Sequence, residues 1–350
     1  SAVVLGVSKF HSLLQASIAT SGNLFRLGGH EAPPSIISVY LGSALTDLIR
    51  RLDNSDVSLP ERGIMDLGLA KLPDIIPFDS DRNRTSPVAF TGDKFEFRAP
   101  GSSQSIALPV TMFASLWAWG IDELIKLVEE KISGGKEPID AALEAAKEAF
   151  KRGSNILFEG DAYTSEWQAE AKKRGLIEAE TMPERIALLL KPENKAMLEN
   201  LGIYKGHELE NLYAVRMDSF STGLEVEAAV MFDMLWEGIL PAIAKQLVLE
   251  KGAMSNIDGL NISDPSLKPW TDFTGGLAHI KAALISDAQR LQELKGMLSG
   301  MESRERADFL AGTVIPHMDS IRAKCDALEL TIAADIWPYP IYRNLLSLSA

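Results

Sequence analysis

The chain has 350 residues, of which 46% are hydrophobic and 24% charged, as in a globular protein with room for two domains. Its net charge of -13 opposes phosphate backbones and anionic lipid, so we expect no nucleic-acid partner and no membrane partner. No apolar run is long enough to span a bilayer, no signal peptide is visible, and the single cysteine, Cys325, excludes an internal disulfide and suits a cytoplasmic location.

The chain opens with apolar residues at helical spacing, which predict a first helix within residues 1–22. Because the sequence starts in the middle of this pattern, we expect the chain to be an excised piece of a longer protein. A loop rich in glycine and proline follows over residues 23–34, and a second helix is predicted over residues 35–52. Residues 53–80 are interrupted by three prolines and predict a surface excursion.

Two short apolar runs flank the sequence Thr-Gly-Asp-Lys at residues 91–94, a pattern that predicts a hairpin of two antiparallel strands. Side chains alternate along a strand, so the three charged residues of the second run, Lys94, Glu96 and Arg98, should share one face. Considered by themselves, these residues also fit an edge hairpin with its polar face in water.

From about residue 102 onward, the periodicity predicts an almost wholly helical chain that forms an antiparallel bundle. The most apolar stretch, residues 106–125, is expected to be a buried helix, and residues 133–136 an interhelical turn. Pro241 and Pro316 should each kink or interrupt a long helix. The aromatic and proline-rich residues 335–342 should form an extended tail.

Standard short motifs for nucleotide, zinc or serine-nucleophile sites do not occur, but three unusual segments lie within the first 105 residues. They are NLFRLGGHEAPP at residues 23–34, DRNRTSP at residues 81–87, and KFEFR at residues 94–98 with GSSQS after it. Arginines that converge suit phosphate or carboxylate groups, and a glutamate between cations suits a divalent metal. A structural cluster of ion pairs is the alternative that these residues leave open.

Taken together and in this order, RLGGHEAPPSIISVYLG, NRTSPVAFTGDKFEFR and GSSQS resemble glutamine synthetases of the large type III class. The ending DIWPYPIY is similar to the carboxy-terminal end of that class, so the resemblance runs from about residue 1 to residue 342. It implies an α+β fold. Residues 1–135 would be the carboxy-terminal portion of the catalytic domain, with helices and short antiparallel strands, and residues 136–350 a mostly α-helical bundle domain with an extended aromatic tail.

The resemblance implies part of an ATP-dependent glutamate–ammonia ligase. In that family ATP phosphorylates the glutamate side chain, and ammonia displaces phosphate from the acyl phosphate. The implied cofactors are ATP with Mg²⁺ or Mn²⁺, the substrates are glutamate, ammonia and ATP, and the intact protein would be a cytoplasmic homo-oligomer. The family's other metal ligands and its substrate loop lie upstream of the region matched here. We therefore expect this chain to be inactive alone.

The same match implies roles for three residues outside the hairpin. Arg26 would bind the substrate glutamate, Glu31 would act as the catalytic carboxylate that takes a proton from ammonium, and Arg84 would grip the transferred phosphoryl group of the nucleotide. Two departures stand close to these positions. Leu24-Phe25 replaces an Asp-His that the family usually has, and Gly29-His30 replaces an Ala-Asn.

Within the hairpin, the match implies that Lys94 lies near the nucleotide phosphates, Glu96 is a metal ligand, and Arg98 contacts substrate. The alternative is a non-catalytic scaffold or interaction module derived from a glutamine synthetase, in which this cluster is vestigial. The apolar pair Leu24-Phe25 favours that alternative. A ligase that acts on another amine or on a glutamate analogue is a third possibility.

Overall fold

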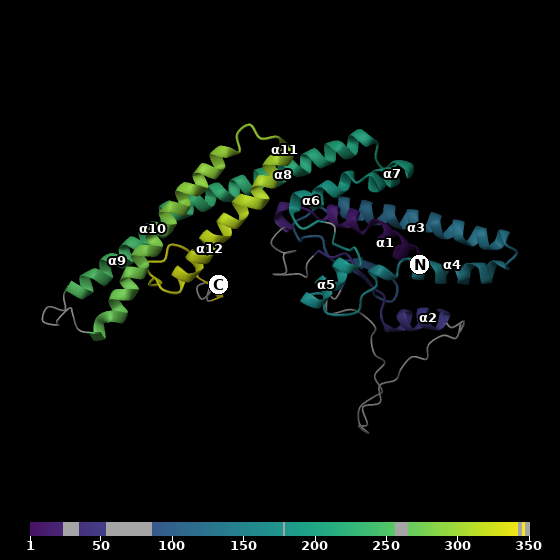
Figure 1. Cartoon of the computed structure of the whole chain (residues 1–350), viewed down its shortest axis with the longest axis horizontal. Helices are drawn as coiled ribbons and strands as arrows, with labels where there is room; N and C mark the ends of the chain where they lie inside the picture. The colour runs from purple at the N-terminus through teal and green to yellow at the C-terminus, as the bar shows by residue number, and fades with distance from the viewer. Residues whose placement is uncertain (24–34, 54–85, 178, 256–264, 342–344, 347–350) are drawn as a thin grey trace, which may run out of the picture. The chain divides into compact units, whose positions relative to one another are not determined.

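The structure is a computed structural model, and Figure 1 shows its course. It describes residues 1–23, 35–53, 86–177, 179–255, 265–341 and 345–346. The described chain is mostly helical with one small mixed sheet, which confirms the α+β class. It divides into two compact units, Ser1–Arg216 and Met217–Ala350. The boundary near residue 135 that the resemblance implies concerns family domains and stays a prediction. None of the described helices is both long and apolar enough to cross a membrane.

The first unit is built on two helices in close contact, α1 (Ala2–Ser17) and α3 (Ala107–Ser133), which lie side by side in Figure 1. A Cβ atom on Gly6 would lie 2.2 Å from a carbonyl oxygen of α3, and one on Gly120 would lie 2.1 Å from a carbonyl oxygen of α1. Glycine is therefore required at both points, because any side chain would separate the two backbones. The predicted first helix is confirmed, although it ends at Ser17 and a short 3-10 turn follows.

The sheet has the order β1 (Val39–Tyr40), β2 (Val88–Phe90) and β3 (Phe95–Phe97). Strands β2 and β3 are antiparallel, with Ala89 opposite Glu96, so the predicted hairpin is confirmed. Its turn contains a glycine with a φ of 98°, a conformation that favours glycine. Strand β1 pairs with β2 in parallel, a contact between distant residues that no local sequence pattern predicts.

The helix predicted over residues 35–52 is wrong in its first part. Residues 36–38 have no helical structure, β1 follows them, and α2 (Ser43–Asp53) begins only after Gly42 with its φ of 82°. The β-branched run Ile36-Ile37 and Val39 fits an extended backbone better than a helix. Ile37 and Val39 are fully buried beside the other strands, so tertiary packing decides the outcome.

Helix α3 confirms the helix predicted for the apolar stretch, but its expected burial is only half correct. Leu116 is fully buried, whereas Val110 is 58% exposed and Trp117 is 45% exposed. A tight turn at residues 134–136 then leads into α4 (Pro138–Arg152), as predicted. The first unit also contains three shorter helices, α5 (Ser165–Lys173), α6 (Met182–Ala187) and α7 (Pro192–Asn200).

The second unit is a helical bundle, as predicted. It contains most of α8 (Gly206–Met234), followed by α9 (Leu240–Ser255), α10 (Lys268–Met297), α11 (Ser303–Phe309) and α12 (Ile315–Glu329). Helix α10 packs against both α9 and α12, and its leucines at positions 277, 284, 291 and 294 are buried in the contact. The last helix ends five residues before the expected end at residue 334, and the chain beyond it forms turns up to residue 341.

Both prolines that were expected to disturb helices stand just after a π-helical turn. Leu235–Ile239 precedes Pro241, and Leu310–Val314 precedes Pro316. Proline lacks an N–H group and its ring crowds the preceding turn, so a widened turn accommodates it without ending the helix. The predicted interruptions are thus confirmed as π turns within otherwise continuous helices.

Candidate functional site

The charged face of β3 brings together the three candidate residues that the structure describes. The Nη2 and Nε atoms of Arg98 donate hydrogen bonds to one carboxylate oxygen of Glu96, over 3.0 and 3.1 Å. The Nζ atom of Lys94 lies 3.8 Å from the other oxygen. Each carboxylate oxygen therefore faces a cation, which confirms that the three side chains share one face. The side chain of Arg98 is 23% exposed and that of Lys94 is 62% exposed.

This arrangement suits anion binding at the guanidinium end. A half-buried guanidinium that a carboxylate holds in orientation is the type of group that binds carboxylate or phosphate through two parallel hydrogen bonds. The more exposed ammonium of Lys94 can contact a phosphate as a point charge. A structural ion pair would show the same contacts between Arg98 and Glu96.

The described residues do not build a metal centre by themselves. A divalent ion of the Mg²⁺ or Mn²⁺ kind takes about six ligands, mostly oxygen atoms. Glu96 supplies one carboxylate, and within the described ranges no group of three or more His, Cys, Asp or Glu side chains is placed to hold a metal ion. The other ligands of an ion at Glu96 would have to come from outside the described residues.

Three expected site residues, Arg26, Glu31 and Arg84, lie outside the described residues. Their roles therefore stay predictions. Asn23, the first residue of the predicted loop rich in glycine and proline, is described. It is fully buried in a short 3-10 turn, Ser21–Asn23, so this residue is part of the packed first unit.

Asn23 ties the end of α1 to the end of β3. Its Nδ2 atom donates hydrogen bonds to the carbonyl oxygens of Ile18 and Ala99, each over 3.1 Å. Ala99 directly follows Arg98, so the amide fixes the backbone next to the candidate guanidinium. Asn23 is the first residue of the first unusual segment, but no local pattern predicts its role, because Ala99 lies 76 residues away in the sequence.

A second amide, Gln104, reinforces the same junction. Its Nε2 atom donates to the carbonyl oxygen of Ser17 over 2.7 Å, and its Oε1 atom accepts from the backbone N–H of Gly101 over 3.3 Å. A Cβ atom on Gly101 would lie 3.1 Å from the side-chain oxygen of Asn23. Asn23 and the segment after β3 therefore meet at one packed junction.

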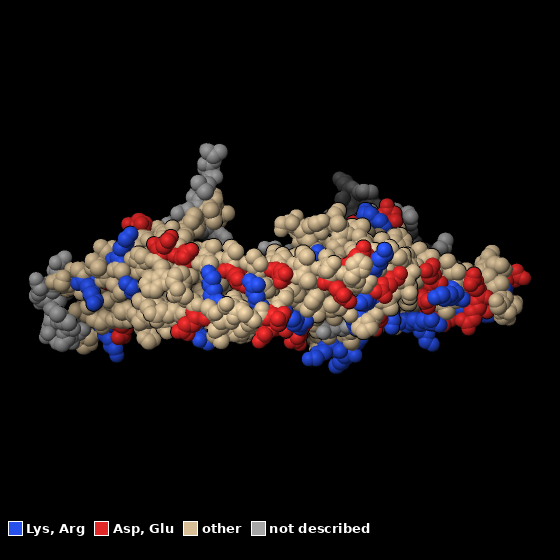
Figure 2. All heavy atoms as spheres, turned by 90° about the horizontal axis from the view of Figure 1, so that it is seen from above, with Lys and Arg blue, Asp and Glu red and all other residues tan. Residues whose placement is uncertain are grey.

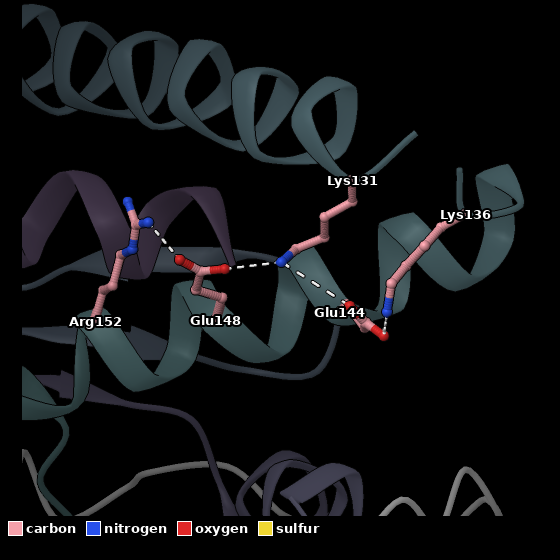
Figure 3. A network of polar contacts seen from close by, with 5 residues as sticks. All are labelled: Lys131, Lys136, Glu144, Glu148 and Arg152. Atoms are coloured by element: carbon pink, nitrogen blue, oxygen red, sulfur yellow. Dashed lines mark hydrogen bonds and ion pairs between the residues drawn. The ribbon is translucent and has the colours of Figure 1, made fainter. Parts of the chain in front are cut away.

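A larger charged network joins α3 to α4, and Figure 3 shows its five side chains. The Nζ atom of Lys131 lies 2.9 Å from a carboxylate oxygen of Glu148 and 4.0 Å from one of Glu144. Glu148 also accepts from Arg152, and Glu144 from Lys136. Each cation of the network contacts a glutamate of α4, so the five side chains fasten the two helices and their turn.

The pKa values of this network follow its hydrogen bonds. The bond from Lys131 and then that from Arg152 lower the pKa of Glu148, and the bond from Lys136 lowers the pKa of Glu144. The bond to Glu148 raises the pKa of Lys131. On the face drawn in Figure 2, lysine and arginine side chains lie among acidic ones.

Comparisons with known proteins show what the sequence of this chain is similar to. Residues 141–253 match the family described as the glutamine synthetase C-terminal domain. The chain is 32% identical over 352 residues to a glutamine synthetase of Bacteroides fragilis, a match that covers 98% of this chain and 48% of that protein. It is 31% identical over 359 residues to a type-3 glutamine synthetase of Dictyostelium discoideum, covering 99% of this chain and 48% of the relative.

The chain is therefore homologous to glutamine synthetases along nearly its whole length. The relative from Dictyostelium carries the type III designation, in agreement with the resemblance of the three segments. The chain spans about half the length of the curated relatives that it matches.

Proposed function

We propose that this chain is the carboxy-terminal part of an ATP-dependent glutamate–ammonia ligase about twice its length. The observation that carries the proposal is the match to glutamine synthetases over 98% of the chain. The charged face of β3 supports it, because it has the guanidinium, ammonium and carboxylate groups that a phosphoryl-transfer site needs for charge neutralisation.

In this proposal, the residues of the β3 face have separate roles. The guanidinium of Arg98, held by Glu96 and by the junction at Asn23, binds substrate. Lys94 contacts nucleotide phosphates. Glu96 is one ligand of a divalent ion whose other ligands lie outside this chain. When bound, that ion would neutralise the charge of the nucleotide phosphates.

The remaining roles follow from the resemblance. Arg26 binds the substrate glutamate, Arg84 holds the transferred phosphoryl group, and Glu31 takes a proton from ammonium so that ammonia can attack γ-glutamyl phosphate. We further propose that the intact protein works as a homo-oligomer in the cytoplasm. Leu24-Phe25 stands where the family usually has Asp-His. This apolar pair is the feature that would make substrate handling differ from that of the family.

A non-catalytic scaffold is the second candidate. It is favoured by the ion pair between Arg98 and Glu96, which satisfies the carboxylate within β3 itself. In that case the hairpin is a structural remnant, and substitutions on its charged face leave phosphate release by the intact protein unchanged.

The proposal is tested by phosphate release in the presence of glutamate, ATP, magnesium and ammonia. The intact protein should release phosphate only when all four are present, and it should form glutamine in equal amount. This chain alone should give the background rate, since it supplies one candidate metal ligand. An intact protein without glutamate-dependent release would reject the ligase, and turnover by this chain alone would reject its dependence on the other half.

A further inference from the structure

The C-terminal end of α1 receives side chains from three segments that are distant from one another in the sequence. A helix leaves its last carbonyl groups without helical partners, so these groups accept hydrogen bonds from elsewhere. The donors are the amide of Gln104 at Ser17, the amide of Asn23 at Ile18 and the guanidinium of Arg216 at Ala19, over 2.7, 3.1 and 3.3 Å. The three residues that carry these carbonyl groups are buried. This end of α1 is therefore a fixed frame for the segments bonded to it.

The side chain of Gln104 connects this frame to the chain that follows β3. The backbone N–H of Gln104 donates to the carbonyl of Gly101 over 3.1 Å, and its side-chain oxygen accepts from the N–H of Gly101 over 3.3 Å. Both backbone groups of Gly101 are thus bonded to Gln104, while the nitrogen of the same amide is bonded to Ser17. A displacement of Gln104 away from α1 would move Gly101 with it.

This movement would reach Arg98, because only Ala99 and Pro100 stand between it and Gly101. Proline fixes its own φ, so the link has little freedom. Ala99 is buried, and its carbonyl accepts from the amide of Asn23. On its other side, the backbone N–H of Arg98 donates to a carbonyl just before β2 over 2.8 Å. The backbone of Arg98 is therefore held between β2 and the link to α1.

Lys94, at the other end of β3, is held in a different way. Its carbonyl accepts from the backbone N–H of Thr91 over 2.9 Å, within the hairpin turn. The length of β3 (Phe95–Phe97) separates this turn from the link to α1. A change at Gln104 should therefore act on Arg98 and leave Lys94 in place.

We propose that Gln104 is a positioning residue, which holds the end of β3 on α1 so that the guanidinium of Arg98 meets a carboxylate of the amino-acid substrate. Side chains that bind a ligand depend on supporting hydrogen bonds of this kind for their geometry. The inference rests on the proposed function, in which Arg98 binds substrate and Lys94 contacts nucleotide. It adds that Gln104 supports binding of the amino acid and not of the nucleotide, whereas a purely structural amide would support both alike.

Ligand binding by the intact protein tests the proposal. Gln104→Met keeps the length of the side chain but removes its donor and its acceptor. Calorimetry in the presence of magnesium measures the Kd of glutamate and the Kd of a non-hydrolysable ATP analogue. The Kd of glutamate should rise by about tenfold, and the Kd of the analogue should keep its parental value. Gln246→Met is the matched control, because it removes a buried amide bonded to Glu250 and Ala333 in the second unit, and it should change neither Kd.

A second variant reaches the same junction without altering Gln104. In Gly101→Ala, the added Cβ would lie 3.1 Å from the side-chain oxygen of Asn23, so one of the two must move. We expect the same selective loss of glutamate affinity, smaller than in Gln104→Met. Circular dichroism shows whether each variant is folded.

Two results would overturn the inference. One is a parental Kd of glutamate in Gln104→Met, and the other is an equal weakening of glutamate and nucleotide binding. Phosphate release is measured on the same preparations, so that the proposed function is tested separately. A parent that binds glutamate without releasing phosphate would reject the ligase alone. An active parent whose Gln104→Met variant binds glutamate equally well would reject the positioning role alone.

Discussion

Asn23 shows how one buried amide can connect distant segments. Asn23→Ala removes two hydrogen bonds between the ends of α1 and β3, and leaves space in a packed junction. We expect the free energy of unfolding of the first unit to fall by about 1–3 kcal/mol. Chemical denaturation followed by circular dichroism measures this change. Asn211→Ala, at an exposed position of α8, is the matched control and should change stability by less than about 0.5 kcal/mol. Equal effects of the two substitutions would contradict the bracing role.

The residue scale also shows which parts of the site a sequence can predict. The common face of Lys94, Glu96 and Arg98 follows from alternation within five residues, and the structure confirms it. The role of Asn23 depends on Ala99, which no local pattern connects to it. The assignments of substrate, nucleotide and metal to these side chains come from the resemblance and stay proposals.

The contact between α1 and α3 depends on two glycines. Gly120→Ala would place a Cβ atom 2.1 Å from a backbone carbonyl oxygen, so the helices must move apart. We expect this substitution to destabilise the first unit by about 1–3 kcal/mol. Gly276→Ala in α10, where an added Cβ has no neighbour within 4 Å, is the control and should stabilise its helix by about 0.5–1 kcal/mol. Thermal unfolding measures the stability of both variants. A Gly120→Ala protein as stable as the parent would contradict the close approach of α1 and α3.

The network between α3 and α4 gives stability a pH dependence. The pKa of Glu148 is lowered in the folded chain, so its contribution is present above its unfolded pKa of about 4.5 and is lost as pH falls through the lower folded value. The melting temperature of the parent should therefore fall between pH 5 and pH 3 more steeply than that of Glu148→Gln, which lacks this group. Glu129→Gln, an exposed glutamate of α3 outside the network, should follow the parent. Parallel pH profiles for parent and Glu148→Gln would contradict the role of the network.

At the scale of single elements, local sequence patterns predict most helices and the hairpin. They fail where pairing with a strand distant in the sequence determines the local structure. Helix α4 begins with Pro138 and ends before Gly153, and proline and glycine are favoured at these two ends of a helix. Residues 35–41 fail as a helix because β1 pairs in parallel with β2, whose register partner of Val39 is Val88. Pairing across 49 positions leaves no periodic signal in the chain itself.

At the scale of the whole molecule, length and composition predict a globular protein with room for two domains, but they do not show where the chain divides into units. The compact units divide at Arg216, within the single helix α8, where no glycine or proline marks a boundary. A continuous helix carries the chain from one unit to the next. What the whole sequence does reveal is the relationship to glutamine synthetases, because three short segments in a fixed order are more specific than any one of them.

The central claim is that the charged face of β3 belongs to a ligase site, and Glu96→Gln in the intact protein tests it most directly. Glutamine keeps the size of the side chain and one acceptor oxygen but removes the negative charge. We expect the rate of glutamate- and ammonia-dependent phosphate release to fall by about 10–100-fold or more. The free energy of unfolding should change by no more than about 1 kcal/mol, as for a partly exposed ion pair. Glu129→Gln is the control and should retain the parental rate. A Glu96→Gln protein that turns over at the parental rate would contradict the claim and assign this face to structure alone.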